Sequence, residues 1–396
     1  MSNARVEVWL DLSDPESLFT LVDLEGGLTR TGAEAVVHPF DVAALREKLG
    51  SDPAPPSPVK ADHARRDFAR RARMRDLAWA GVEAPAELGA ATAALAACPA
   101  DQSFALALRL LRATFCDGID LGVPAALSAL VGGVPPEAPP RDLTERAAAA
   151  GVVSSPNFRV GERVLLGARR LERLERTLGG TPPEAAPVGD GPAVDVWFDY
   201  SSPYAYVGVH RAVVALGPRA RLRPMLLGGV FKTLGVPMVP IARCSEPERE
   251  LLLEDMALEA EAAGLPFRFP TKFPINSVTP LRMTLAAEAH ETPEGWRLVD
   301  RIFRAYWSEG QDISDPGTLV ALAEQVGFDG DGLLERAGTP EVKAQLVRAG
   351  EAAVAAGVFG APTFVVPGPD GASSLYWGSD RLGLALAAAS GDDRAR

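Results

Sequence analysis

In the second half of the chain, apolar residues recur at strand spacing in some segments and at helix spacing in others. These segments predict, in order, a strand, a helix, a second strand, a long helical region, two more strands and a last helix. The predicted strands are 194–200, 221–227, 363–366 and 374–377, the last two joined by a glycine-rich turn at 367–372. The predicted helices are 203–216, 247–263, 280–290, 295–307, 316–326, 340–356 and one that begins at Asp380. This order predicts an α/β fold of the thioredoxin type with a helical insertion, in which helices pack on a small mixed sheet.

The first half repeats these patterns. Residues 194–207 read Val-Asp-Val-Trp-Phe-Asp-Tyr-Ser-Ser-Pro-Tyr-Ala-Tyr-Val, and residues 6–19 read Val-Glu-Val-Trp-Leu-Asp-Leu-Ser-Asp-Pro-Glu-Ser-Leu-Phe. Three further matches follow in the same order: 112–127 with 304–319, 151–160 with 357–366, and 166–171 with 377–382. The segment 179–193 is rich in glycine and proline and has no apolar period, which predicts a linker. We therefore expect two tandem thioredoxin-like domains, 1–178 and 194–390.

The composition predicts a soluble globular protein. Of the 396 residues, 47% are hydrophobic, which is enough for two ordinary cores. The net charge of −12 argues against nucleic acid or an anionic membrane surface as a partner. No signal peptide is recognisable, and no apolar segment reaches the roughly 20 residues of a membrane span. A run of arginines is expected to form a solvated helix face: Arg65, Arg66, Arg70, Arg71, Arg73 and Arg75.

The cysteines and histidines carry no metal or redox pattern. Cys98, Cys116 and Cys244 never form a Cys-x-x-Cys pair, so neither a disulfide framework nor a thiol–disulfide redox pair is expected. This favours a reducing cytoplasm, and a disulfide oxidoreductase would lack its nucleophile near Ser202. The histidines show no metal-ligand spacing and are expected to be structural or exposed. They are His38, His63, His210 and His290.

Ser202 is the first candidate for chemistry. It precedes Pro203 at the start of an apolar helix, where a serine is a good N-cap and proline suits the first helical position. A hydroxyl beside a helix N-terminus can also donate to a thiolate and hold it. At the corresponding position the first half has Asp14, which can cap a helix but would repel a thiolate. The repeat therefore predicts one working half and one retired half.

Two later motifs point to the same half. Ala361-Pro362-Thr363 opens a predicted strand with proline, which by itself indicates no more than strand initiation. Between the last strand and the last helix, Ser379 can cap that helix and Asp380 can pair with an ammonium group. Together they suit an amino acid headgroup. The first half has Ala168 and Arg169 instead, which would remove that recognition.

Five motifs of the second half fall in one order. They are Phe198 to Tyr206, Leu227 to Lys232, Phe269-Pro270 with Phe273 to Asn276, Gly357 to Phe364, and Trp377 to Leu382. Together they resemble the 2-hydroxychromene-2-carboxylate isomerases, a family close to the kappa-class glutathione transferases and to the DsbA-like thioredoxin fold. The resemblance covers essentially all of 194–388, whereas the first half is similar only in its scaffold motifs.

The resemblance implies glutathione as cofactor and assigns roles by position. Ser202 would stabilise the glutathione thiolate, and Ala361, before a family cis-proline at Pro362, would pair with the backbone of the glutathione cysteine. Ser379 and Asp380 would hold the γ-glutamyl end. These families commonly have Gly-Asn where this chain has Gly235-Val236, so that contact is missing, and Lys232 or Arg243 is left to meet the glycine carboxylate. Residues that line the substrate pocket would be Tyr204, Phe231 and Asn276, although core packing explains Tyr204 equally well.

Three functions remain open at this stage. The leading hypothesis is a glutathione-dependent isomerase that acts on an aromatic-derived or other electrophilic small molecule. The alternatives are a kappa-like glutathione transferase, and a non-enzymatic binding or scaffold protein that has lost glutathione. Because the related enzymes are typically dimers of one such domain, the tandem chain is also expected to form an intramolecular pseudo-dimer.

Overall fold

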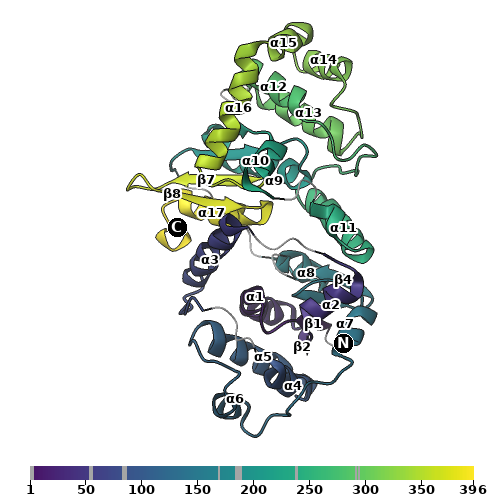
Figure 1. The fold of residues 1–396 in the computed structure, drawn as a ribbon, viewed down its shortest axis with the longest axis vertical. Helices are drawn as coiled ribbons and strands as arrows, with labels where there is room; N and C mark the ends of the chain where they lie inside the picture. Colours follow the sequence, from purple (N-terminus) through teal and green to yellow (C-terminus); the bar gives the residue numbers. More distant parts are fainter. Residues whose placement is uncertain are drawn as a thin grey trace. The chain divides into compact units, whose positions relative to one another are not determined.

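The computed structural model describes residues 4–52, 57–82, 87–167, 170–182, 190–236, 240–289, 292 and 295–396. The chain divides into two compact units, each built on a four-stranded sheet (Figure 1). The first unit comprises Met1–Pro53, Arg65–Glu184 and Ile241–Asp255, and the second comprises Ala54–Ala64, Ala185–Pro240 and Met256–Arg396. Each unit thus takes one short segment from the opposite half of the sequence. Within the described residues, no helix is long and apolar enough to cross a membrane.

The two sheets have the same topology and register. Their strand orders are β2-β1-β3-β4 and β6-β5-β7-β8, with the second strand of each order parallel to the first and antiparallel to the third. Trp9 lies opposite Asn157 in the first sheet, and Trp197 lies opposite Thr363 in the second. The repeated phrases therefore occupy equivalent strands. The bounds are β1 (Arg5–Leu10), β2 (Glu34–Pro39), β3 (Asn157–Val160), β4 (Arg163–Leu166), β5 (Val194–Phe198), β6 (Ala220–Pro224), β7 (Thr363–Pro367) and β8 (Ser373–Trp377).

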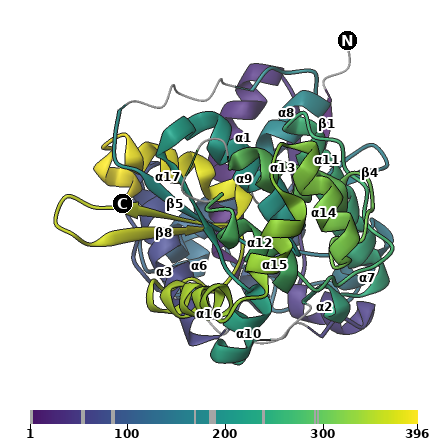
Figure 2. The ribbon, with the colours of Figure 1, turned by 90° about the horizontal axis from the view of Figure 1, so that it is seen from above.

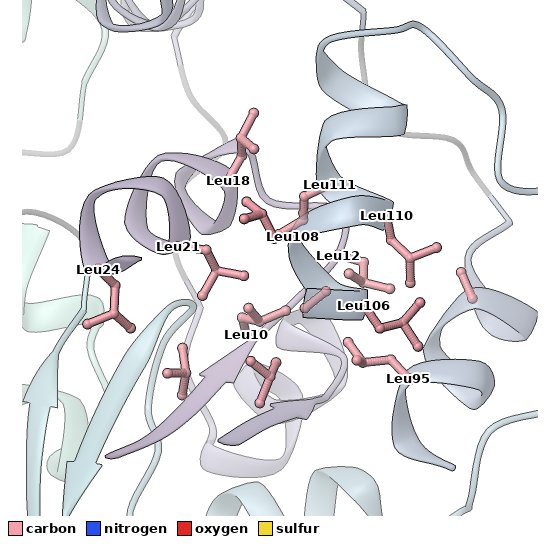
Figure 3. Close-up of a cluster of buried hydrophobic side chains, with 14 of the residues drawn as sticks. Leu10, Leu12, Leu18, Leu21, Leu24, Leu95, Leu106, Leu108, Leu110 and Leu111 are labelled. Atoms are coloured by element: carbon pink, nitrogen blue, oxygen red, sulfur yellow. The ribbon is translucent and has the colours of Figure 1, made fainter. Parts of the chain in front are cut away.

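Leucine side chains fill the core of the first unit. Figure 3 shows leucines of β1, α1, α4 and α5 around one shared space. They repeat at helical spacing, so one face of each helix is apolar. The helices of this half are α1 (Pro15–Thr31), α2 (Val42–Leu49), α3 (Pro58–Arg73), α4 (Gly89–Ala96), α5 (Ala100–Phe115), α6 (Pro124–Val131), α7 (Leu143–Ala149) and α8 (Leu171–Thr177).

The arginine run is only partly the solvated face that was expected: Arg65, Arg66 and Arg73 are exposed, but Arg70 and Arg71 are buried. The side chains of Arg70 and Arg71 are only 5% exposed. Arg71 pairs with Glu16 at 2.7 Å and lies over the ring of Phe19. Arg75 makes a two-pronged pair with Asp23. The expectation fails for the buried arginines, because an arginine can be buried when carboxylates and an aromatic face compensate for the lost water.

The first part of α11 (Glu246–Ala262) packs in the first unit through Asp255. This carboxylate is 2% exposed and accepts two hydrogen bonds of 2.7 Å from Arg170. Arg173 donates a third at 2.7 Å. Burial raises the pKa of Asp255, but the two arginines outweigh it and hold the pKa below its usual value. A residue of the second half is thus fixed by two residues of the first.

The remaining helices largely follow the sequence periods. The structure begins α10 at Leu227, where an extended stretch was expected, because the carboxylate of Asp199 accepts from the Leu227 N–H at 2.7 Å and starts the helix. An unpredicted helix, α15, follows α14. The bounds are α9 (Pro203–Leu216), α10 (Leu227–Leu234), α12 (Val278–Ala286), α13 (Trp296–Trp307), α14 (Pro316–Gln325), α15 (Gly330–Ala337), α16 (Pro340–Ala355) and α17 (Leu382–Ala389).

Helices cover both sides of the second sheet. Figure 1 shows α16 on one side of β7 and β8 and α17 on the other. Trp197 of β5 and Val365 of β7 share an apolar cluster with Val230 of α10 and Ala353 of α16. The insertion between β6 and β7 gathers α12 to α15 into a helical layer (Figure 2). This layering leaves the loops at the ends of β5, β7 and β8 to form a site.

Candidate functional site

Ser202 caps α9 and contacts the loop before β7. Its hydroxyl oxygen accepts from the Ala205 N–H at 3.1 Å, and its hydroxyl donates to the Ala361 carbonyl at 2.9 Å. The residue is 7% exposed, and Pro203 occupies the first helical position. The predicted cap is confirmed. The second hydrogen bond joins residues 159 positions apart and brings two predicted site residues together.

The turn that carries Ser202 is held rigidly. Asp199 accepts from the Ser201 N–H at 2.9 Å as well as from Leu227, and burial raises the pKa of this carboxyl while those bonds oppose the rise. The Trp307 indole donates to the Tyr200 carbonyl at 2.8 Å. A turn fixed at three consecutive residues keeps the Ser202 hydroxyl in place.

Pro362 and Ser379 lie against the same helix. The Ala361–Pro362 bond is cis. A Cβ at Gly208 of α9 would lie 2.6 Å from Pro362 Cγ and 3.5 Å from Ser379 Cα, so only glycine permits this close approach. The Gly378 N–H donates to the Pro362 carbonyl at 3.0 Å. Four predicted residues, Ser202, Ala361, Pro362 and Ser379, therefore lie along the first half of α9.

Ser379 does not cap the last helix as expected. It opens a 3₁₀ turn, Ser379–Arg381, and α17 begins only at Leu382 without a side-chain cap. The backbone reaches this turn through Gly378 at φ 105°, a conformation that favours glycine. Ser379 is 2% exposed, and the Asp380 carboxylate pairs with the guanidinium of Arg381. The turn thus holds a carboxylate and a cation side by side, and both side chains are nearly buried.

Sequence reasoning missed an aromatic and basic group beside this turn. The Trp377 indole rests on Gly360, where any Cβ would collide with it, and its ring lies 4.9 Å from that of Phe359. His63 and Lys60 of α3, which belong to the second unit, complete the group. The His63 ring is 5.2 Å from that of Phe359, and the Lys60 ammonium is 5.2 Å from the Trp377 ring. His63 is buried, and burial lowers the pKa of Lys60. No sequence signal links residues 300 positions apart.

The other predicted residues are placed differently. Arg243 belongs to the first unit, where it donates to the Asp52 carbonyl at 2.6 Å and pairs with the Asp52 carboxylate, so we do not place it at the site. Asn276 is exposed and accepts from the Val278 N–H at the start of α12. Lys232 is exposed on α10, Phe231 is buried there, and Tyr204 is half-buried in the first turn of α9.

The equivalent position in the first unit holds a carboxyl. Asp14 caps α1 by accepting from the Glu16 N–H at 3.0 Å, as predicted, and faces Ser155, which precedes a second cis-proline, Pro156. Burial, together with the charges of Glu16 and Asp11, raises the pKa of Asp14 to about 7. Ala168, Arg169 and His290 lie outside the described residues.

Replacing Asp14 by asparagine should stabilise the protein above pH 7. The folded-state pKa of this acid lies above its ordinary value, so the folded chain binds the proton more tightly and stability falls as the pH rises from about 4 to about 7. Asparagine keeps the cap but has no proton to lose, and the gain is up to about 4 kcal/mol. Urea unfolding between pH 5 and pH 8 measures it. Asp41→Asn, at the exposed cap of α2, controls for net charge; equal pH slopes in the parent and Asp14→Asn would refute the prediction.

No cluster of metal-ligating side chains occurs in the part of the chain that the structure describes. The candidate site offers the Ser202 hydroxyl, the Ala361 backbone and the Asp380–Arg381 pair. Such a set can hold a thiolate and an amino acid headgroup, because one end offers a hydroxyl and a helix N-terminus and the other offers both signs of charge.

Comparisons with known proteins point to the same half of the chain. Residues 193–388 match the DSBA-like thioredoxin domain family. Glutathione S-transferase kappa 1 of Homo sapiens is 31% identical over 204 residues, which cover 48% of this chain and 88% of that protein. The 2-hydroxychromene-2-carboxylate isomerase of Sphingobium xenophagum is 27% identical over 197 residues, covering 48% and 93%. A solved structure of a 2-hydroxychromene-2-carboxylate isomerase aligns with a TM-score of 0.43 at 25% identity, over 50% of this chain and 93% of that one.

Proposed function

This chain belongs to the family of DsbA-like thioredoxin domains that includes glutathione transferase kappa and 2-hydroxychromene-2-carboxylate isomerase, and we propose that it is a glutathione-dependent isomerase. Its related families are enzymes. The observation that carries the proposal is the Ser202 hydroxyl at the start of α9, bonded to Ala361 beside cis-Pro362. The proposed substrate is an aromatic-derived or other electrophilic small molecule.

The residues at the start of α9 fit glutathione. The Ala361 carbonyl accepts one hydrogen bond from Ser202, and a ligand N–H competes for the same acceptor. When it does, the Ser202 hydroxyl is released to rotate and donate elsewhere. At the other end, Asp380 suits the ammonium of a γ-glutamyl group and Arg381 its carboxylate. Lys60, which has no recorded ion pair among the described residues, adds a cation near Trp377.

Glutathione supplies a thiol that, as the thiolate, adds reversibly to an electrophilic carbon. The role of the chain is to stabilise the thiolate relative to the protonated thiol. Ser202 would donate a hydrogen bond to the sulfur of bound glutathione, and the positive end of α9 would favour negative charge there. Asp199 and Trp307 keep the turn in place, so this donor needs no rearrangement of the backbone during the reaction.

Two assays separate the candidate functions. We expect calorimetry to show glutathione binding, and glutathione-dependent isomerisation of a 2-hydroxychromene-2-carboxylate to exceed conjugation of an aromatic halide such as 1-chloro-2,4-dinitrobenzene. The reverse order of rates would identify a kappa-like transferase. Absence of glutathione binding would leave the binding or scaffold role that the replacement at Val236 also favours.

We further propose that the chain is a tandem duplication whose halves act as an intramolecular pseudo-dimer. The identical registers of the two sheets support the duplication. The assignment of Ala54–Ala64 to the second unit and of Ile241–Asp255 to the first supports mutual dependence, since each unit is completed by the opposite half. A stable and active monomer made of residues 190–396 alone would contradict this proposal.

A further inference from the structure

A cavity of about 540 Å³ lies between α10, α12 and α16 of the second unit. Its size falls in the range of small-molecule sites. Leu226, Leu346 and Val354 supply apolar walls, and neither Ser202 nor the turn at Ser379 lines it. The cavity is therefore separate from the proposed glutathione site.

The charges that line the cavity are unusual. Arg282, Lys343 and Glu351 all line it, and none of the three has a recorded ion pair or side-chain hydrogen bond among the described residues. The Nε of Arg282 is inaccessible to solvent and has no hydrogen-bond partner there. Leaving a buried donor on a charged group unsatisfied costs about 1 to 3 kcal/mol. The terminal nitrogens of the same guanidinium also have no acceptor among the described residues, and Arg282 lines the cavity.

Two glycines face the cavity without a structural reason. Gly350 stands inside α16, where a Cβ would meet nothing within 4 Å, and Gly229 stands inside α10, where a Cβ would make only ordinary contact with Leu226. Glycine inside a helix costs about 0.5 to 1 kcal/mol relative to alanine. The backbone does not require either glycine, and both widen the cavity.

We propose that this cavity binds a small carboxylate with an apolar body. The carboxylate accepts from the terminal nitrogens of the Arg282 guanidinium, which lines the cavity, and Lys343 adds a second positive charge. The body of the ligand lies against Leu226, Leu346 and Val354 in the space left open at Gly350. Glu351 disfavours a second negative charge on the ligand, which restricts the class to monocarboxylates.

The test uses the full chain and two probes of the same shape, 2-naphthoate and the uncharged 2-naphthamide. Titration calorimetry should show 2-naphthoate binding at least about tenfold more tightly than the amide, which corresponds to about 1.4 kcal/mol. Equal affinities, or no binding of 2-naphthoate, would overturn the proposal.

Two substitutions test whether 2-naphthoate binds in this cavity. Arg282→Met should weaken 2-naphthoate at least about tenfold and leave 2-naphthamide unchanged. Gly350→Leu should abolish binding of both, because its side chain fills the cavity, and it should not unfold the protein, since leucine is the better helix former. The matched control is Gly27→Leu in α1, where a Cβ also meets nothing within 4 Å. Unchanged 2-naphthoate binding in Gly350→Leu would put the ligand elsewhere and refute the site.

Discussion

Replacing Ser202 by alanine is expected to lower the glutathione-dependent rate at pH 7 by about 10- to 100-fold. A free thiol has a pKa near 8.5, and lowering it by about two units requires roughly 2.7 kcal/mol of preferential stabilisation of the thiolate. The hydroxyl and the N-terminus of α9 share that task, so removing the hydroxyl loses a large part of it. The thiolate absorbance of bound glutathione, followed against pH, measures the shift directly and does not depend on the substrate.

Two variants at the same position separate chemistry from helix capping. Alanine also removes the cap, at about 1 kcal/mol of stability. Ser202→Asp keeps a cap, as Asp14 does in the first unit, but should abolish thiolate formation because the carboxylate repels the sulfur. Ser202→Thr keeps both functions and should retain activity. Full thiolate formation in Ser202→Ala would remove this hydroxyl from the mechanism.

Replacing Asp255 by alanine is expected to cost about 3 to 5 kcal/mol of unfolding free energy. The carboxylate is nearly inaccessible and receives hydrogen bonds from Arg170 and Arg173, whose own side chains are 9% and 13% exposed. Without it, two almost buried guanidinium groups lose their carboxylate. Against a typical stability of 5 to 15 kcal/mol, this loss is large.

The control for Asp255 is its neighbour. Glu254 pairs with Arg163 at 3.0 Å, but both side chains are about half exposed, so Glu254→Ala should cost no more than about 1 kcal/mol. The lowered pKa of Asp255 adds a pH test: its stabilisation is present above the ordinary value of 3.8 and is lost as the pH falls through the lower folded-state pKa. Similar urea midpoints for the two alanine variants at pH 7 would contradict the prediction.

Site residues could be predicted from the sequence where the same side chain serves both a local structural role and the proposed chemistry. Ser202 was found because a serine before proline at an apolar helix start is a local pattern, and its repeat at Asp14 gave a direct comparison. Ser379 was placed in the right turn but given a cap that it does not make. Arg243 was assigned by charge alone, and its partner Asp52 lies 191 residues away, a distance that no local pattern spans.

The sequence by itself determined the two sheets, their equivalent phrases, most helices and the half that carries the candidate chemistry, because periodicity, caps and turn residues act over a few positions. Only the tertiary structure decided the burial of Arg71 and the hydrogen bond from Ser202 to Ala361. It also decided that a short segment of each half belongs to the unit built mainly from the other half, which sets Lys60 beside Trp377 and Asp255 beside Arg170. These contacts join residues far apart in the chain. They depend on which surfaces meet, and the charge or polarity of a single residue does not encode that.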